Sequence, residues 1–451
     1  MYLKTLIDIP TDPHPEAFKI LLPLGLILLT AKLFALLFHK IKVPQVIGFL
    51  CAGLVVGLIY LIPGQTILTD YTVTNGIGFF AKIAVILILF SAGVETDLKK
   101  IKEVGKASIF IALGGVLVPM LLTFVAAHII NMCTGNALAL PGVDPIFTEL
   151  YYGVVLTATS VSITVATLKE LGKLDGKIGS ALVSSAIIDD VIGIIVLSLV
   201  ISLSSSDNAD YSGSDIPSLI MNALPHEAQS AGLNLTLIII FMLFFFGLTI
   251  GLGIFIRKFF NWMGEKYPHH IRNTIFSLAF CFLWAYVAEY FNIADITGAY
   301  LMGLILSSTK EHNYIDHRAE TTNNYLFAPV FFGNIALGMY QSNFNFTDPA
   351  FLTFFGFGCL WIVLGLVGKV LGCSGVALCF KFKGKDALKI GVGMMARAEV
   401  LIVCAQKGVD AGLISNDIVP FCLILILLSS FLTPILLKAL YKEPKQECTL
   451  A

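Results

Sequence analysis

Residues 177–203 read KIGSALVSSAIIDDVIGIIVLSLVISL and contain two adjacent aspartates, Asp189 and Asp190, within an otherwise apolar run. No other charged residue occurs between Lys177 and Asp207. About 20 mostly apolar residues suffice to cross a bilayer as a helix. An ionised side chain at the centre of a bilayer is costly, so charged residues there usually have a function. The stretch therefore predicts a transmembrane helix with a functional pair of carboxylates near its middle.

The composition of the whole chain indicates a membrane protein. Only 13% of its 451 residues are charged and 57% are hydrophobic, whereas soluble proteins carry about 25% charged residues. The formal net charge of −1 argues against nucleic acid as a partner, because proteins that bind nucleic acid present a basic face. The nine cysteines show no CxxC or Cys/His spacing. The sequence therefore predicts neither a disulfide framework nor a resident metal site.

Hydropathy predicts thirteen membrane spans, and hence an all-α polytopic membrane protein. The N-terminal residues lack the basic region and cleavage site of a signal peptide, so the first apolar run is expected to remain as a span. The predicted spans are 17–38, 44–62, 74–95, 106–131, 149–168, 177–203, 234–256, 271–290, 293–308, 324–341, 350–379, 386–407 and 417–440.

Basic residues alternate along the connections between these spans. Every second connection is rich in lysine and arginine and the others are nearly empty of them, with Lys407 as the one exception. Because basic loops stay in the cytoplasm, we expect a multi-pass protein of the cell (inner) membrane with its N-terminus outside and its C-terminus cytoplasmic. An odd number of spans with two similar halves suggests an inverted repeat. Lys32 and Lys82 lie nearer to predicted span ends and are assigned to the membrane interface.

The aspartate pair predicts a site at which protons and a metal cation compete. Two carboxylates this close cannot both ionise freely unless a cation lies between or beside them. The alternative interpretation is that Asp189 and Asp190 only form hydrogen bonds with neighbouring helices.

The preceding span contains LTATSVSITVATL, in which five hydroxyl side chains fall within eight residues. These side chains are Thr157, Thr159, Ser160, Ser162 and Thr164. Such residues weaken a helix and can satisfy backbone groups that a break exposes. An unwound segment here would offer oxygen ligands to a hard cation. Packing of small residues between helices is the alternative, and composition does not decide between the two.

Lys369 lies deep in the apolar run LWIVLGLVGKVLGCSGVAL. A buried ammonium is least costly in an ion pair, and Asp189 and Asp190 are the candidate partners. The alternative is a lysine that extends to the membrane surface.

Arg397 and Glu399 lie within the next run, KIGVGMMARAEVLIVCAQ, where Gly391 and Gly393 would permit a break in the helix. We expect these two charges either to take part in the site or to form a structural ion pair, with each other or with a neighbouring helix.

The ordered set of motifs resembles the bacterial monovalent cation:proton antiporters, specifically the sodium/proton exchanger branch with two aspartates. The motifs cover nearly the whole chain. They are VPQVIGFLCAGLVVG (43–57), LFSAGVETDLKKIKEVGK (89–106), TATSVSIT (157–164), AIIDDVIG (186–193), ITGAYLMGLIL (296–306), FAPVFFGNIALGM (327–339), VGKVLG around Lys369, and GMMARAEV (393–400). Two departures stand out. The Pro-Arg-Gly-Glu sequence frequent in the family is Ala396-Arg397-Ala398-Glu399 here, which predicts a milder break, and the Gln-Asp pair of potassium-efflux relatives is Asp-Asp.

The resemblance implies a role for each site residue. Asp190 would be the main carboxylate for the transported cation and the proton, and Asp189 its partner, paired with Lys369 when no cation is bound. The segment 157–162, with Thr157, Thr159 and Ser160, would form one discontinuous crossing helix and 393–399 the other.

The resemblance also implies a homodimer with a defined division of the chain. Residues 1–104 (helices 1–3) and 259–348 (helices 8–10) would form the dimer domain. Residues 105–208 (helices 4–6) and 349–441 (helices 11–13) would form the moving core. Residues 209–258 would supply a loop and linker helix 7, and 442–451 a cytoplasmic tail.

The sequence therefore predicts an electrogenic sodium (or lithium)/proton antiporter in which a sliding core exposes the aspartates to each side in turn. More than one proton would exchange per cation, because two carboxylates and a lysine can titrate. A potassium/proton antiporter is the alternative. A proton-gated channel is less favoured because the sequence shows no continuous polar path. A membrane sensor is less favoured because the sequence shows no soluble output domain. We predict no enzyme activity and no cofactor, since the loops contain no nucleophile–base set.

Overall fold

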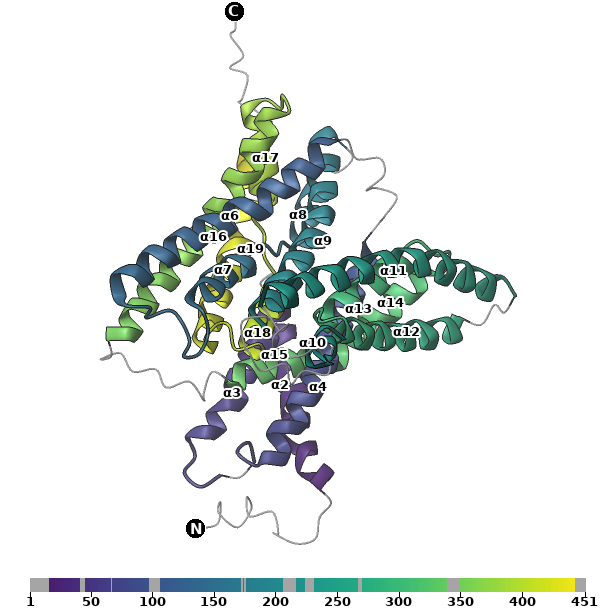
Figure 1. Cartoon of the computed structure of the whole chain (residues 1–451), viewed down its shortest axis with the longest axis vertical. Coiled ribbons are helices and arrows are strands. Elements are labelled where there is room, and N and C mark those ends of the chain that lie inside the picture. The colour runs from purple at the N-terminus through teal and green to yellow at the C-terminus, as the bar shows by residue number, and fades with distance from the viewer. Residues whose placement is uncertain are drawn as a thin grey trace, which may run out of the picture.

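A computed structural model describes residues 16–40, 45–65, 67–96, 106–171, 173, 176–205, 216–223, 231–266, 270–338 and 349–442. These residues form helices and the connections between them, and no strand occurs among them. The helices cross one another as rods of different length (Figure 1). The predicted all-α fold is confirmed.

Each predicted span coincides, in its described part, with one helix or with two consecutive helices. In the first half these are α2 (Glu16–Lys40), α3 (Gln45–Gly57) with η1 (Leu58–Leu61), α4 (Tyr71–Glu95), α6 (Lys106–Thr134), α7 (Pro145–Val155) with α8 (Val161–Glu170), and α9 (Lys177–Ser205). In the second half they are α11 (Ala231–Lys266), α12 (His270–Tyr290), α13 (Asp295–Leu306), α15 (Ala328–Gly338), α16 (Pro349–Cys379), α17 (Gly384–Gly393) with α18 (Glu399–Asp410), and α19 (Val419–Tyr441), which follows η5 (Asn416–Ile418).

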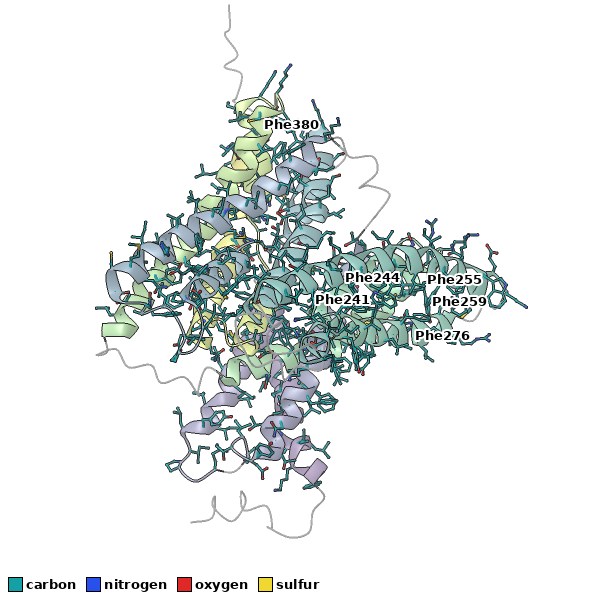
Figure 2. All side chains as sticks on the ribbon, viewed as in Figure 1. Phe241, Phe244, Phe255, Phe259, Phe276 and Phe380 are labelled. Atoms are coloured by element: carbon teal, nitrogen blue, oxygen red, sulfur yellow. The ribbon has the colours of Figure 1, made fainter. Side chains whose placement is uncertain are left out.

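Seven helices of the described residues are long and apolar enough to cross a membrane by themselves. They lie at 18–38, 71–95, 106–134, 177–204, 236–266, 352–379 and 416–441. Large apolar side chains such as Phe244 and Phe255 on α11 point outward and are more than half exposed (Figure 2). Lipid is the solvent that suits such a surface. The full count of thirteen spans stays a prediction.

The structure differs from the predicted spans at three helices. Helix α11 continues to Lys266, ten residues beyond the predicted end. The prediction ended early because the last turns contain charged residues, which hydropathy does not score as part of a span. Helix α10 (Ile216–Ala223) forms inside the predicted polar loop 204–233, whose other residues lie largely outside the described part. Helix α14 (His312–Thr322), continued by the π-helical turn η3 (Asn323–Phe327), is polar and buries only Ile315 and Ala319.

The helices pack in two bundles. Helices α6, α7, α8, α9, α16, α17, α18 and α19 pack mainly with one another, and we call them the site bundle because they carry the predicted site. Helices α2, α3, α4, α11, α12, α13, α14 and α15 do the same and form the flanking bundle. Helix α9 reaches across to α11 and α13.

Glycines allow the closest helix contacts within each bundle. In the flanking bundle, α4 and α13 meet at Gly93 and Gly303, where a β-carbon would lie 2.3 Å from the carbonyl oxygen of Tyr300 or Phe90, respectively. In the site bundle, a β-carbon at Gly372 of α16 would lie 2.2 Å from the carbonyl oxygen of Gly114 on α6.

We expect Gly303→Ala to destabilise the folded protein. The added methyl group must push α13 away from the backbone of α4, and overpacking of this kind costs roughly 1–3 kcal/mol. The thermal unfolding midpoint of the purified protein in detergent should fall. Gly356→Ala on α16 is the matched control, because nothing lies within 4 Å of its β-carbon position. An equal midpoint for both variants would contradict the packing argument.

Candidate functional site

The two aspartates lie midway along α9 with different surroundings. Asp189 is fully buried, whereas Asp190 is partly exposed. Consecutive residues of a helix point about 100° apart, so the two carboxylates face different neighbours. Asp189 faces α6 and α16, and Asp190 lies on the side near Tyr300 of α13 and Cys404 of α18.

Asp189 forms an ion pair with Lys369 of α16. The ammonium nitrogen of Lys369 lies 2.7 Å from Oδ1 and 2.8 Å from Oδ2 of Asp189, and both side chains are fully buried. Thr159 donates a hydrogen bond of 2.6 Å to Asp189 Oδ2, and Lys369 donates a second bond of 2.8 Å to the carbonyl oxygen of Thr157. Removing one partner of such a buried pair typically costs roughly 3–5 kcal/mol, because the remaining charge is left uncompensated.

Two interrupted helices cross beside this pair. Helix α7 ends at Val155 and α8 begins at Val161, and α17 ends at Gly393 and α18 begins at Glu399. The non-helical segments are joined by a backbone hydrogen bond of 2.8 Å from Ser160 N–H to the carbonyl oxygen of Ala396. The Thr164 hydroxyl donates 2.6 Å to the carbonyl oxygen of Gly393. The hydroxyl-rich stretch and the Gly391/Gly393 run therefore do mark breaks in the helices, including the one without the family's proline.

The helix break also positions Thr157, Thr159 and Ser160. All three residues are buried in the non-helical segment after α7. The Thr157 hydroxyl donates 2.8 Å to the carbonyl oxygen of Val154, at the end of that helix. The structure thus brings together the predicted residues Asp189, Lys369, Thr157 and Thr159, while Ser160 links the two crossing segments.

Arg397 is the second buried cation of the site. Its side chain has no exposed surface, and its guanidinium donates hydrogen bonds to the carbonyl oxygens of Ala158 and of Gly365, the latter at 3.2 Å. The Arg397 N–H donates 3.1 Å to the Ser429 hydroxyl. The carbonyl end of a helix carries a partial negative charge, so the placement of Arg397 and Lys369 on the carbonyls of Ala158 and Thr157, just beyond the end of α7, is favourable. The Glu399 side chain lies outside the described part.

Two glycines that sequence reasoning missed make room for the site. A β-carbon at Gly115 of α6 would lie 3.1 Å from Asp189 Oδ1 and 2.7 Å from the sulfur of Cys373. A β-carbon at Gly193 of α9 would lie 3.1 Å from the Thr157 hydroxyl. The GG pair at 114–115 was the available signal, since glycines in membrane helices often mark close packing.

Comparison with known proteins identifies the family of this chain. Residues 25–443 match the family model described as "Sodium/hydrogen exchanger, transmembrane". The chain is 29% identical to the Na(+)/H(+)-K(+) antiporter GerN of Bacillus cereus, over 93% of this chain and 96% of that protein. It is 28% identical to the Na(+)/H(+) antiporter of Enterococcus hirae, over 93% and 97%, respectively.

The fold is shared with a solved antiporter structure. The sodium proton antiporter MjNhaP1 from Methanocaldococcus jannaschii superposes with a TM-score of 0.62 at 18% identity, covering 94% of this chain and 96% of that one. The resemblance that the motifs indicated is thereby confirmed at the level of the family. The chain belongs to the sodium/hydrogen exchanger family of membrane transporters.

Proposed function

We propose that this exchanger moves sodium (or lithium) in one direction and protons in the other through Asp189 and Asp190. The observation that supports the proposal best is the buried ion pair between the Lys369 ammonium and Asp189, one of the two carboxylates. A metal cation that binds the aspartates competes with this ammonium. Asp190 is the main cation and proton site, and the hydroxyl and carbonyl oxygens of 157–160 are available as further ligands.

The charges of the buried site support an electrogenic cycle. Asp189 and Asp190 supply two carboxylates, and Lys369 and Arg397 supply two cations in the same buried region. When a sodium ion binds, Lys369 is displaced from Asp189 and can release its proton. The protons of the carboxylates and of the lysine together then exceed one per sodium ion, so each turnover moves net charge.

The packing in two bundles supports a mechanism of alternating access. The site lies entirely on helices of the site bundle, so a displacement of that bundle along the flanking bundle would carry the aspartates toward the other side. We propose on this basis that 105–208 and 349–441 form the moving core, and 1–104 and 259–348 the static part. We further propose that the static part forms a homodimer in the cell membrane, with the N-terminus outside and the C-terminus in the cytoplasm.

Transport by the purified protein in liposomes tests this function. Addition of sodium outside acid-loaded proteoliposomes should make the interior more alkaline, and lithium should act like sodium. Protein-free liposomes are the control. Equal or greater alkalinisation by potassium would favour the potassium/proton alternative. The name of the Bacillus cereus relative also includes potassium. No response to any of the three cations would overturn the proposal.

A further inference from the structure

Three polar contacts join the two bundles at the connection between α12 and α13. Lys407 of α18 forms an ion pair with Asp295, the first residue of α13. Ser198 of α9 contacts the Thr297 hydroxyl at 2.5 Å. Ser202 of α9 donates to the carbonyl oxygen of Asn292. We call residues 292–297 the α12–α13 corner.

The Lys407–Asp295 pair is mostly buried and crosses the boundary between the bundles. The two side chains are 18% and 17% exposed. Ion pairs on the surface contribute little to stability, but a pair removed from water is costly unless both partners stay together. Lys407 is also the residue that breaks the alternation of basic connections along the chain. The rule that places basic loops in the cytoplasm therefore does not explain the position of Lys407.

Two cavities that share Lys407 in their lining lie at the boundary between the bundles. A cavity of about 800 Å³ is lined by Glu289 and Asp295 together with Lys82, Lys407 and Asp410. A smaller cavity of about 130 Å³ is also lined by Lys82, Lys407 and Asp410. Val403 and Phe331 line another part of its wall. Lys82, which the sequence assigns to the membrane interface, instead lies midway along α4 and faces both cavities. Lys407 thus stands where the two cavities meet.

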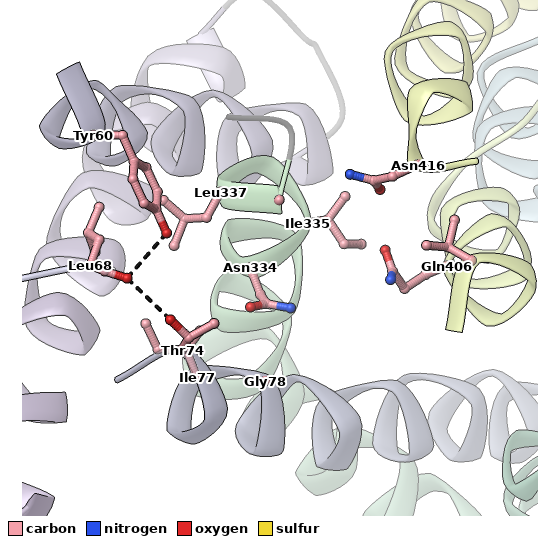
Figure 3. A pocket seen from close by; sticks show the side chains of 12 residues that line it. Tyr60, Leu68, Thr74, Ile77, Gly78, Asn334, Ile335, Leu337, Gln406 and Asn416 are labelled. Atoms are coloured by element: carbon pink, nitrogen blue, oxygen red, sulfur yellow. Dashed lines mark hydrogen bonds between the residues drawn. The ribbon is translucent and has the colours of Figure 1, made fainter. Parts of the chain in front are cut away.

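A third cavity extends the same line. It measures about 440 Å³ and shares Asn334 and Gln406 with the smaller cavity. Asn334 of α15 faces Gln406 and Asn416 across the space between the bundles (Figure 3). Polar groups from both bundles therefore line this part of the boundary, as a path for a hydrated ion requires.

We propose that the α12–α13 corner is a latch on the transport cycle, with Lys407 and Asp295 as its positioning residues. In the structure the latch holds the site bundle against the flanking bundle at this end. When the site bundle moves, the three contacts must separate, and the cavities beside Lys407 join into one entry path. This inference rests on the proposed alternating access. Neither residue touches Asp189 or Lys369 in any contact described above.

A reversible cross-link tests the latch directly. Ser198 and Thr297 have their hydroxyls in contact, so cysteines at both positions lie within reach of a disulfide. In proteoliposomes of Ser198→Cys/Thr297→Cys, a small membrane-permeant oxidant should lower sodium-driven proton movement at least about tenfold, and a reductant should restore it. A contact that only stabilises the fold would not arrest transport in this reversible way.

The single variants Ser198→Cys and Thr297→Cys, treated identically, are the matched controls for oxidation of the native cysteines. Unchanged transport in a double variant whose disulfide is verified by mass spectrometry would overturn the latch. So would a failure of the two thiols to join, because the contact would then not be populated in the membrane.

Charge reversal examines the ion pair itself. Asp295→Lys and Lys407→Asp each place like charges in a mostly buried contact, which is strongly unfavourable. Each single variant should therefore transport at least about tenfold more slowly, and the double reversal should return to within about threefold of wild type. The Lys310–Glu265 pair, 2.5 Å apart and exposed within the flanking bundle, is the matched control. Its single reversals, Lys310→Glu and Glu265→Lys, should leave transport unchanged.

Single reversals of the latch pair that transport at the wild-type rate would overturn the proposal, as would a double reversal that restores nothing. These outcomes differ from a failure of the proposed function. A wild-type protein without sodium-driven proton movement would remove the exchange activity itself, whereas an active wild type with indifferent latch variants removes only the latch.

Discussion

Asp190→Asn is expected to abolish exchange while the protein remains folded. Asparagine keeps the size of the side chain but can neither carry a proton at neutral pH nor supply the negative charge that binds a metal cation. If one site serves both ions in turn, both half-reactions stop together. Sodium-dependent alkalinisation of acid-loaded proteoliposomes should fall to the level of protein-free liposomes, and the thermal unfolding midpoint should stay close to that of wild type.

Asp386→Asn is a suitable control for this variant. Asp386 lies in the first turn of α17 and forms a 3.0 Å ion pair with Lys389 near the surface, so it shares the chemistry of Asp190 without its location. Its removal should leave transport intact. Substantial sodium-driven proton movement by Asp190→Asn would remove Asp190 from the site.

Lys369→Gln is expected to lower the charge moved in each cycle. Glutamine cannot bind and release a proton, so the count of protons exchanged per sodium ion falls. Current on a solid-supported membrane after sodium steps, compared with uptake of radioactive sodium by the same liposomes, gives the ratio of charge to sodium. The ratio should be smaller for the variant than for wild type. An unchanged ratio would mean that Lys369 serves only packing and would remove the basis for an electrogenic cycle.

Two further variants separate the transport role of Lys369 from its structural role. Lys369→Gln removes the ion-pair partner of the fully buried Asp189, and this alone destabilises the protein. Asp189→Asn/Lys369→Gln removes both charges and should recover much of the lost thermal stability. Lys389→Gln, which removes the lysine of the partly buried pair with Asp386, should leave the ratio of charge to sodium unchanged. Recovered stability in the double variant would show that the stability loss of Lys369→Gln comes from the unpaired Asp189 carboxylate, separately from the effect of the lysine on the charge ratio.

Local sequence was sufficient to predict the elements that carry the site. The apolar run 177–203 predicted the extent of α9 because a single segment of this length must pair its own backbone groups in lipid, and only a helix does so. The breaks after α7 and α17 were readable from hydroxyls and glycines that weaken a helix. These are properties of neighbouring residues, which a sequence displays directly.

The partners of Arg397 and Lys407 could not be predicted in the same way. Arg397 donates to the carbonyl oxygens of Ala158, in the non-helical segment after α7, and of Gly365 on α16, and to no carboxylate in any described hydrogen bond. The helix break leaves the Ala158 carbonyl open to such a donor, as an intact helix would not. Lys407 meets Asp295, 112 residues earlier in the chain. Gly115 matters only because α6 passes close to Asp189. Each of these contacts is set by how the helices cross, which the order of residues does not show.

The pairing of Asp189 with Lys369 has a consequence for biosynthesis. The lysine follows the aspartate by 180 residues, and ribosomes add about 5–20 residues per second, so Asp189 exists for roughly 10–40 s before its counter-charge has been made. During that time α9 must enter the bilayer with a protonated or still hydrated carboxylate, because an isolated charge is costly there. The crossing of the two broken helices is completed only when α17 and α18 arrive. The site of this exchanger is therefore assembled last, after most of its spans have already been inserted.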